Sequence, residues 1–130
     1  MAEAKLKIFM LDDERMLLDL YKLKFEKMGY EVFAYNDADE ALRVLRGGFA
    51  PNVILFDITM PDSKSGYEFI ETVQREKLAK HALKIALTNE GSDGAIGRAE
   101  ELGADAHILK AKYIPSELVT AVSELLAKRR

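Results

Sequence analysis

Five short apolar runs recur along the chain and alternate with longer amphipathic stretches. The runs are Ile8–Leu11, Val32–Tyr35, Val53–Phe56, Ile85–Leu87 and Ala106–Leu109. Each run is nearly continuous rather than alternating, which is typical of parallel strands covered by helices on both faces. Their short length and the flanking Gly, Pro, Asn and Asp residues favour strands over buried helical pieces. The sequence therefore predicts an α/β protein with a parallel sheet.

The stretches between the runs carry apolar residues at helical spacing. Five helices are predicted: about Leu17–Met28, a second after Asp37 that closes at Gly47, about Tyr67–Leu78, Ser92–Leu102, and a fifth that opens at Pro115. Five strand–helix units in tandem favour an open, doubly wound sheet, because closed barrels of this kind usually need eight units. We expect one domain over residues 1–130, since these units occupy the chain from about Lys5 onward.

Composition narrows the possible chemistry. The chain has no cysteine, which excludes disulfides, thiolate metal sites and cysteine nucleophiles. Its two histidines, His81 and His107, are too few for a histidine-rich zinc site. A net charge of −3 argues against nucleic acid or an anionic membrane as the main partner. No apolar run exceeds four residues and the first residues do not resemble a signal peptide, so we expect a cytoplasmic protein.

Reactive side chains follow four of the five predicted strands. Asp12 and Asp13 come after the first strand, Asp57 after the third, Thr88 after the fourth and Lys110 after the fifth. In open parallel sheets, ligands bind beyond the carboxyl ends of the strands. We therefore expect these five side chains to gather at one rim of the sheet.

Three carboxylates, an ammonium and a hydroxyl make a specific chemical combination. Crowded carboxylates repel one another, and their pKa values rise unless a cation lies among them. Oxygen ligands without His or Cys select a hard ion, most plausibly Mg²⁺. The ammonium and the hydroxyl would contact an anion attached to one carboxylate. The combination suits phosphoryl transfer onto that carboxylate.

From about Lys5 to Lys128 the chain resembles a bacterial response-regulator receiver domain of the chemotaxis-regulator type. The matching residues are Asp12-Asp13, Asp57 followed by Met60-Pro61, Gly66, Thr88 and Lys110. The resemblance implies a flavodoxin-like fold with five helices and the strand order 2-1-3-4-5. It also implies a role in two-component phosphorelay signalling, as a switch with slow autodephosphorylation rather than as an enzyme.

The resemblance assigns a role to each acidic residue. Asp57 would accept a phosphoryl group from a sensor histidine kinase or a phosphotransfer protein. Asp13, Asp57 and the backbone carbonyl of Thr59 would ligate Mg²⁺, and Asp12 would act on the ion through water.

The resemblance also implies a switch and an output. Thr88 and Lys110 would contact the phosphoryl oxygens, and Thr88 together with His107 would form the switch. The output would be a downstream protein partner or an effector domain outside this chain. The fourth helix, fifth strand and fifth helix would form the surface of a homodimer.

Four features depart from the family pattern. The loop after Asp57 is one residue longer than usual. Asn89 stands where Gly or Ala is usual, and we expect its larger side chain to narrow access to Asp57 and to slow phosphorylation. His107 stands where Tyr or Phe is usual. Ala111 replaces a proline that is usually preceded by a cis peptide bond, and a non-proline cis bond costs about 2.5–4 kcal/mol. None of these changes removes a reacting group.

Other interpretations remain open at this point. The chain is a partner-regulated binding module if its site is inactive. A metal-dependent phosphohydrolase is less favoured, because such enzymes generally carry a second acid two residues after the nucleophile, where Thr59 stands. Asp12-Asp13 alone would suit a helix N-cap. The chain is either a free-standing receiver or the first domain of a longer regulator.

Overall fold

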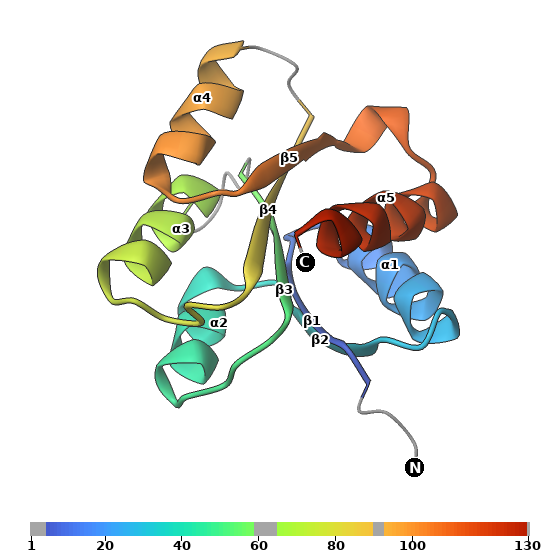
Figure 1. Ribbon diagram of the computed structural model, residues 1–130, viewed down its shortest axis with the longest axis horizontal. Coiled ribbons are helices and arrows are strands. Elements are labelled where there is room, and N and C mark those ends of the chain that lie inside the picture. Colours follow the sequence, from blue (N-terminus) through green and yellow to red (C-terminus); the bar gives the residue numbers. More distant parts are fainter. Residues whose placement is uncertain (1–4, 59–64, 90–92, 130) are drawn as a thin grey trace.

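The computed structural model describes residues 5–58, 65–89 and 93–129 of the chain. Its five strands are β1 (Lys7–Leu11), β2 (Glu31–Tyr35), β3 (Val53–Asp57), β4 (Leu83–Thr88) and β5 (Ala106–Leu109). They form one parallel sheet in the order β2-β1-β3-β4-β5 (Figure 1). The predicted fold class and strand order are confirmed.

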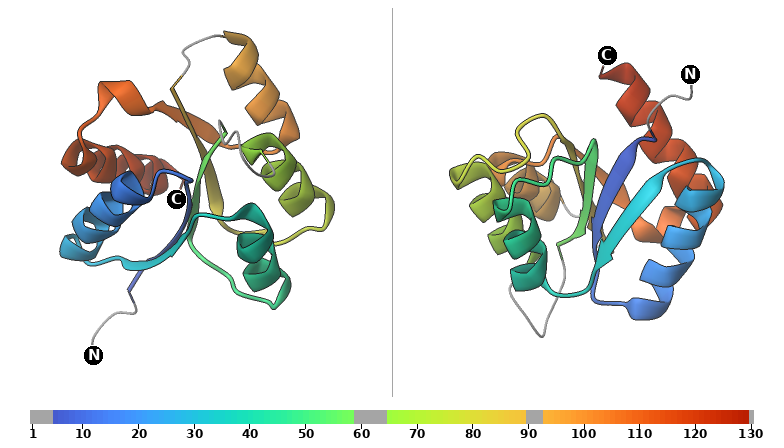
Figure 2. Two further views of the ribbon diagram at one scale, coloured as in Figure 1. Left: turned by 180° about the vertical axis from the view of Figure 1, so that it is seen from behind. Right: turned by 90° about the horizontal axis from the view of Figure 1, so that it is seen from below.

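Helices cover both faces of the sheet. They are α1 (Arg15–Lys27), α2 (Ala38–Arg46), α3 (Gly66–Arg75), α4 (Asp93–Leu102) and α5 (Pro115–Lys128), with the short 3₁₀ helix η1 (Lys110–Lys112) before α5. One face carries α1 and α5, and the other carries α2, α3 and α4 (Figures 1 and 2). In the described ranges, no helix has the length and apolar character needed to cross a membrane.

The sheet separates two hydrophobic cores. The core under α1 and α5 includes Ile8, Met10, Leu18, Phe25, Leu55, Ile85, Leu118 and Val122. The core under α2, α3 and α4 includes Phe9, Leu11, Leu42, Ile54, Phe56, Phe69, Ile70 and Val73. Successive residues of a strand point to opposite faces, so β1 and β3 need apolar residues at nearly every position.

Two details differ from the sequence-based expectation. The edge strands β2 and β5 are only partly buried, because each has a neighbouring strand on one side alone. The third helix ends at Arg75 rather than near Leu78. Lys77, with φ of +57°, leaves the helical path, and Leu78 packs against the core from the following turn.

The helix starts follow capping chemistry, with one informative exception. The Asp37 side chain accepts a hydrogen bond from the Glu40 backbone N–H at 3.1 Å, and Pro115 is the first residue of α5. The N-cap of α1 is Glu14, and no side-chain hydrogen bond caps this helix. The acidic pair Asp12-Asp13 is therefore not explained as an N-cap.

Candidate functional site

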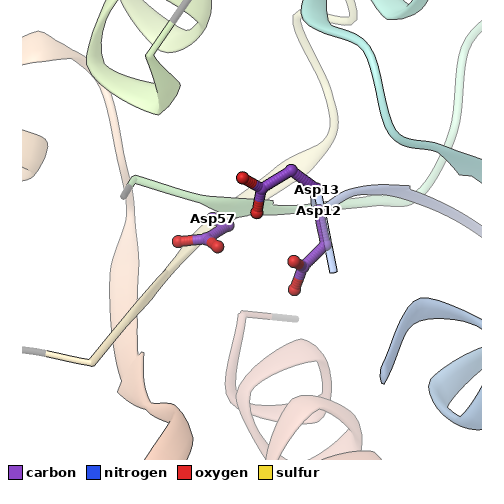
Figure 3. A group of neighbouring side chains, drawn as sticks. All are labelled: Asp12, Asp13 and Asp57. Atoms are coloured by element: carbon purple, nitrogen blue, oxygen red, sulfur yellow. The ribbon is translucent and has the colours of Figure 1, made fainter. Parts of the chain in front are cut away.

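The carboxyl ends of β1 and β3 bring three carboxylates together. The two strands are neighbours, with Leu11 opposite Phe56, so the acids that follow these positions emerge side by side. Oxygen atoms of Asp12, Asp13 and Asp57 all lie within 4.8 Å of one another (Figure 3). The predicted acidic cluster is present at the predicted rim.

Lys110, which follows the edge strand β5, contacts two of these carboxylates. Its Nζ lies 2.9 Å from Oδ2 of Asp57 and 2.8 Å from Oδ2 of Asp12. The exposed fractions of these side chains are 4% for Lys110, 1% for Asp57 and 2% for Asp12. The ion pairs are therefore almost fully shielded from water, in contrast to the weak pairs of a protein surface.

A third carboxylate approaches the same ammonium. Oε1 of Glu14 lies 3.4 Å from Nζ of Lys110, although its side chain is about half exposed. Glu14 was not among the site residues predicted from the sequence. The available signal was its position, since it directly follows the acidic pair at the end of the first strand.

Burial and charge shift the pKa values in the site. Burial raises the pKa of Asp12 from 3.8 to about 6, and the close Lys110 ammonium offsets only part of that rise. Burial and then the charge of Asp57 raise the pKa of Asp13. Burial alone would lower the pKa of Lys110, but its bonds to Asp12 and Asp57 outweigh burial and raise it. Lys110 therefore stays charged while the carboxylates remain incompletely compensated.

The donor set fits a hard divalent cation. Oδ1 of Asp12 accepts a hydrogen bond from the Glu14 backbone N–H at 3.0 Å. The buried Oδ2 of Asp12 has no well-directed hydrogen bond, and its close contact is the ion pair with Lys110. Carboxylate oxygens without nitrogen or sulfur donors are the ligands that Mg²⁺ prefers. The residues present therefore fit this ion.

The neighbouring strand and helix complete the walls of the site. Thr88 is fully buried at the end of β4, one position beyond Leu87, which is paired with Asp57. Gly66 begins α3 against the end of β3. A Cβ on Gly66 would overlap the backbone of Asp57 and Ile58, so only glycine permits this approach.

The remaining predicted site residues lie farther out or outside the described ranges. His107 is exposed on β5 opposite Ala86, and its side chain makes no hydrogen bond or ion pair with the described residues. Asn89 is exposed beyond β4. The peptide bond between Lys110 and Ala111 is trans, as expected for a non-proline residue. Thr59, with the longer loop at 59–64, lies outside the described residues.

Comparison with known proteins gives a consistent result. The family model of the response regulator receiver domain matches residues 8–123. The alkaline phosphatase synthesis transcriptional regulatory protein PhoP of Bacillus subtilis is 30% identical over 94% of this chain and 49% of its own length. The phosphate regulon transcriptional regulatory protein PhoB of Escherichia coli is 28% identical over 94% and 52%. The chain thus spans about half the length of these relatives.

Solved structures agree with the sequence relatives. A CheY-like response regulator receiver domain protein from Methanospirillum hungatei is 31% identical, with a TM-score of 0.82 and 96% of each chain covered. The chemotaxis response regulator CheY4 of Vibrio cholerae is 24% identical, with a TM-score of 0.82 and coverage of 95% and 99%. The likeness to CheY4 supports the fold alone, whereas the likeness to the Methanospirillum hungatei protein supports both the fold and the family.

Proposed function

Because the chain belongs to the response regulator receiver domain family of two-component signalling, we propose that Asp57 is its phosphoacceptor. The observation that carries the proposal is the buried contact between Asp57 and Lys110 inside a cluster of carboxylates. The Lys110 ammonium would respond to charge added at Asp57, because the two groups are in direct contact at 2.9 Å.

The proposed reaction is a single transfer. A carboxylate oxygen of Asp57 forms a bond to phosphorus, the bond to the histidine nitrogen of the donor breaks, and the electron pair leaves with the imidazole. The Lys110 ammonium and the Thr88 hydroxyl would contact the phosphoryl oxygens. Slow hydrolysis of the acyl phosphate would then restore the carboxylate, which makes the domain a self-resetting switch rather than an enzyme with turnover.

The acidic cluster would hold Mg²⁺ during this reaction. Asp13 and Asp57, with the backbone carbonyl of Thr59, are the proposed ligands, and Asp12 would act through water. The bound ion would supply positive charge that offsets the carboxylates and the phosphoryl oxygens. The raised pKa values of Asp12 and Asp13 support this assignment, since both carboxylates lack full compensation without a further cation.

Lys110 is the proposed link between phosphorylation and the protein surface. It begins η1, directly after β5, so a shift of its backbone would move the connection to α5. A phosphoryl group on Asp57 would draw the ammonium away from Asp12 and Glu14. Together with Thr88 and His107, this shift would reshape the face formed by α4, β5 and α5. That face is the proposed surface for a downstream partner, an effector domain or a homodimer.

The histidine donor needs a docking surface beside the site. An exposed apolar stripe runs along α1, which starts directly after the acidic pair. The stripe consists of Met16, Leu20 and Leu23, with exposed fractions of 88%, 41% and 48%. Their spacing of four and three residues places them on one face of the helix. We assign this α1 stripe to the phosphohistidine-bearing helix of a cytoplasmic kinase or phosphotransfer protein.

The direct test is phosphorylation by a small acyl phosphate with Mg²⁺, followed by intact-protein mass spectrometry. We expect the mass of one phosphoryl group to be added to the wild type and to Asp19→Asn, an exposed control on α1. Asp57→Asn should gain nothing. Absence of the added mass with both small donors and kinases would favour the partner-regulated binding module. Continuous turnover of phosphate esters would favour the phosphohydrolase.

A further inference from the structure

A polar cavity lies at the opposite end of the sheet from the carboxylate cluster. Its volume is about 510 Å³. It is lined by residues from the end of α3, the turn that leads into β4 and the turn before β5, and by Arg129 at the end of α5. Because the strands are parallel, this is the amino-terminal edge of β4 and β5. The phosphoacceptor site makes no use of it.

The cavity carries an excess of positive charge. Lys77, Lys80, Lys84 and Arg129 line it, and Asp105 is the one acidic residue in its described lining. Oδ2 of Asp105 already accepts a hydrogen bond from the backbone N–H of Lys84 at 2.8 Å. The single carboxylate is therefore held at the backbone, and it does not balance four cations.

The central observation is that the Lys84 side chain is buried with few polar partners. Its exposed fraction is 6%, and its Nζ donates one hydrogen bond, to the Ala82 carbonyl at 3.3 Å. Within the described part of the chain, no carboxylate lies within 4.0 Å of this ammonium. Burying a charged ammonium against one neutral acceptor is unfavourable. Burial lowers the pKa of Lys84, Asp105 opposes this shift, and the nearby charge of Arg129 adds to it.

The turn after α3 adds a second cation in a costly conformation. Lys77 has φ of +57°, a left-handed conformation that glycine adopts freely and that other residues adopt at a steric cost. Gly29 and Gly103 occupy the corresponding positive-φ positions after α1 and α4. At the end of α3, the chain places a lysine at the cavity edge where a glycine would fit without strain.

We propose that this cavity binds a small phosphate-bearing molecule. Phosphate offers up to two negative charges and several acceptor oxygens, which suits lysine ammoniums approaching from different elements and the planar guanidinium of Arg129. Leu78, which is partly exposed and lines the cavity, supplies apolar surface for an organic portion. The cavity volume lies within the usual range for small-molecule sites, about 300–1,000 Å³.

The test is a titration followed by ¹⁵N-resolved NMR in metal-free buffer, with inorganic pyrophosphate and adenosine monophosphate as separate probes. We expect saturable shifts of the Lys84, Gly103 and Asp105 amides, and no comparable shifts at Asp13 or Asp57. Tighter binding of the nucleotide would indicate an organic phosphate, and tighter binding of pyrophosphate would indicate an inorganic one. The absence of saturable shifts with both probes at millimolar concentrations would overturn the proposal.

Two variants separate charge recognition from general packing. Lys84→Met keeps the volume and removes the buried charge, so the affinity should fall about tenfold or more while the protein stays folded. Asp105→Asn keeps an oxygen that accepts the Lys84 backbone bond and removes the competing charge, so the affinity should rise. Lys22→Met, an exposed change on α1, is the control. Unchanged affinity in Lys84→Met would refute the assigned site.

Discussion

At the scale of single residues, Lys110 is shared among more carboxylates than one ammonium can neutralise. Asp12 and Asp57 bind it at 2.8 and 2.9 Å, and Glu14 approaches to 3.4 Å. Asp13 adds another negative charge beside them. Without a further cation, part of the folding free energy is spent on holding these like charges together. Burial is the main cause of the raised pKa values of Asp12 and Asp13, and the charge of Asp57 adds to both shifts.

The titration of Asp12 should be visible in the stability of the metal-free protein. Its pKa is about 6 in the folded chain and 3.8 as the ordinary value. The folded state therefore holds the proton more tightly, so this group favours folding below pH 3.8, and that contribution is lost as the pH rises through about 6. Over this window the loss reaches up to about 3 kcal/mol.

The measurement is the free energy of unfolding by urea at several pH values, compared between the wild type and Asp12→Asn. Other acids titrate in the same range, so the difference between the two proteins is the informative quantity. Asp12→Asn should gain stability relative to the wild type as the pH increases from 4 toward 7. Asp19→Asn should show no such trend. A difference that does not vary with pH would contradict the burial argument for Asp12.

At the scale of elements, the start of α3 is pressed against the end of β3. Gly66→Ala would place a Cβ inside the backbone of Asp57 and Ile58, so the helix start must shift. We expect a loss of about 1–3 kcal/mol in the free energy of unfolding, with slower phosphorylation because Asp57 is displaced.

Gly97→Ala is the matched control. Its Cβ would meet no atom within 4 Å, and the residue lies inside α4. This change should stabilise the protein by about 0.5–1 kcal/mol. Equal effects of the two substitutions would disprove the role of close packing at Gly66.

The α1 stripe should affect transfer from a protein donor and leave the chemistry intact. Leu20→Ser removes apolar contact area from an exposed position, so the rate of transfer from the kinase should fall about tenfold or more. Phosphorylation by a small acyl phosphate should be unchanged, since Leu20 does not line the acidic site. Lys22→Ser, an exposed change off the stripe, should affect neither rate. If Leu20→Ser slows both donors equally, the α1 stripe is not a docking surface.

At the scale of the whole molecule, the site was predictable because it follows from topology. Parallel strands place all their carboxyl ends at one edge, so Asp12, Asp57 and Lys110 could be assigned to one rim from their positions after apolar runs. Burial on both faces made β1 and β3 recognisable as strands. The edge position of β2 was predicted only through the family resemblance, because strand order does not follow from the periodicity of any single run.

The missed features depend on contacts between residues distant in the sequence. Glu14 approaches Lys110 across a separation of 96 positions, and nothing in its local pattern marks this contact. Lys84 falls within a strand whose predicted core was Ile85–Leu87, and its burial depends on the turns before β4 and β5. Arg129 is exposed at the end of α5. Its place at the basic cavity comes from the packing of α5.

The described strands form one sheet, so a cation bound at the carboxylate cluster should stabilise the whole molecule against unfolding. Mg²⁺ that binds the folded state alone stabilises it by mass action, by about 2.7 kcal/mol when its concentration is about 100 times Kd. Thermal unfolding should therefore show a Tm that rises with Mg²⁺ concentration.

Asp13→Asn should lose this response. Its metal-free Tm should equal or exceed that of the wild type, because burial and the charge of Asp57 disfavour the ionised form of Asp13. Asp19→Asn should keep the full response. An identical Mg²⁺ response in Asp13→Asn would place the ion elsewhere, and an unchanged wild-type Tm would remove the cation from the proposed mechanism.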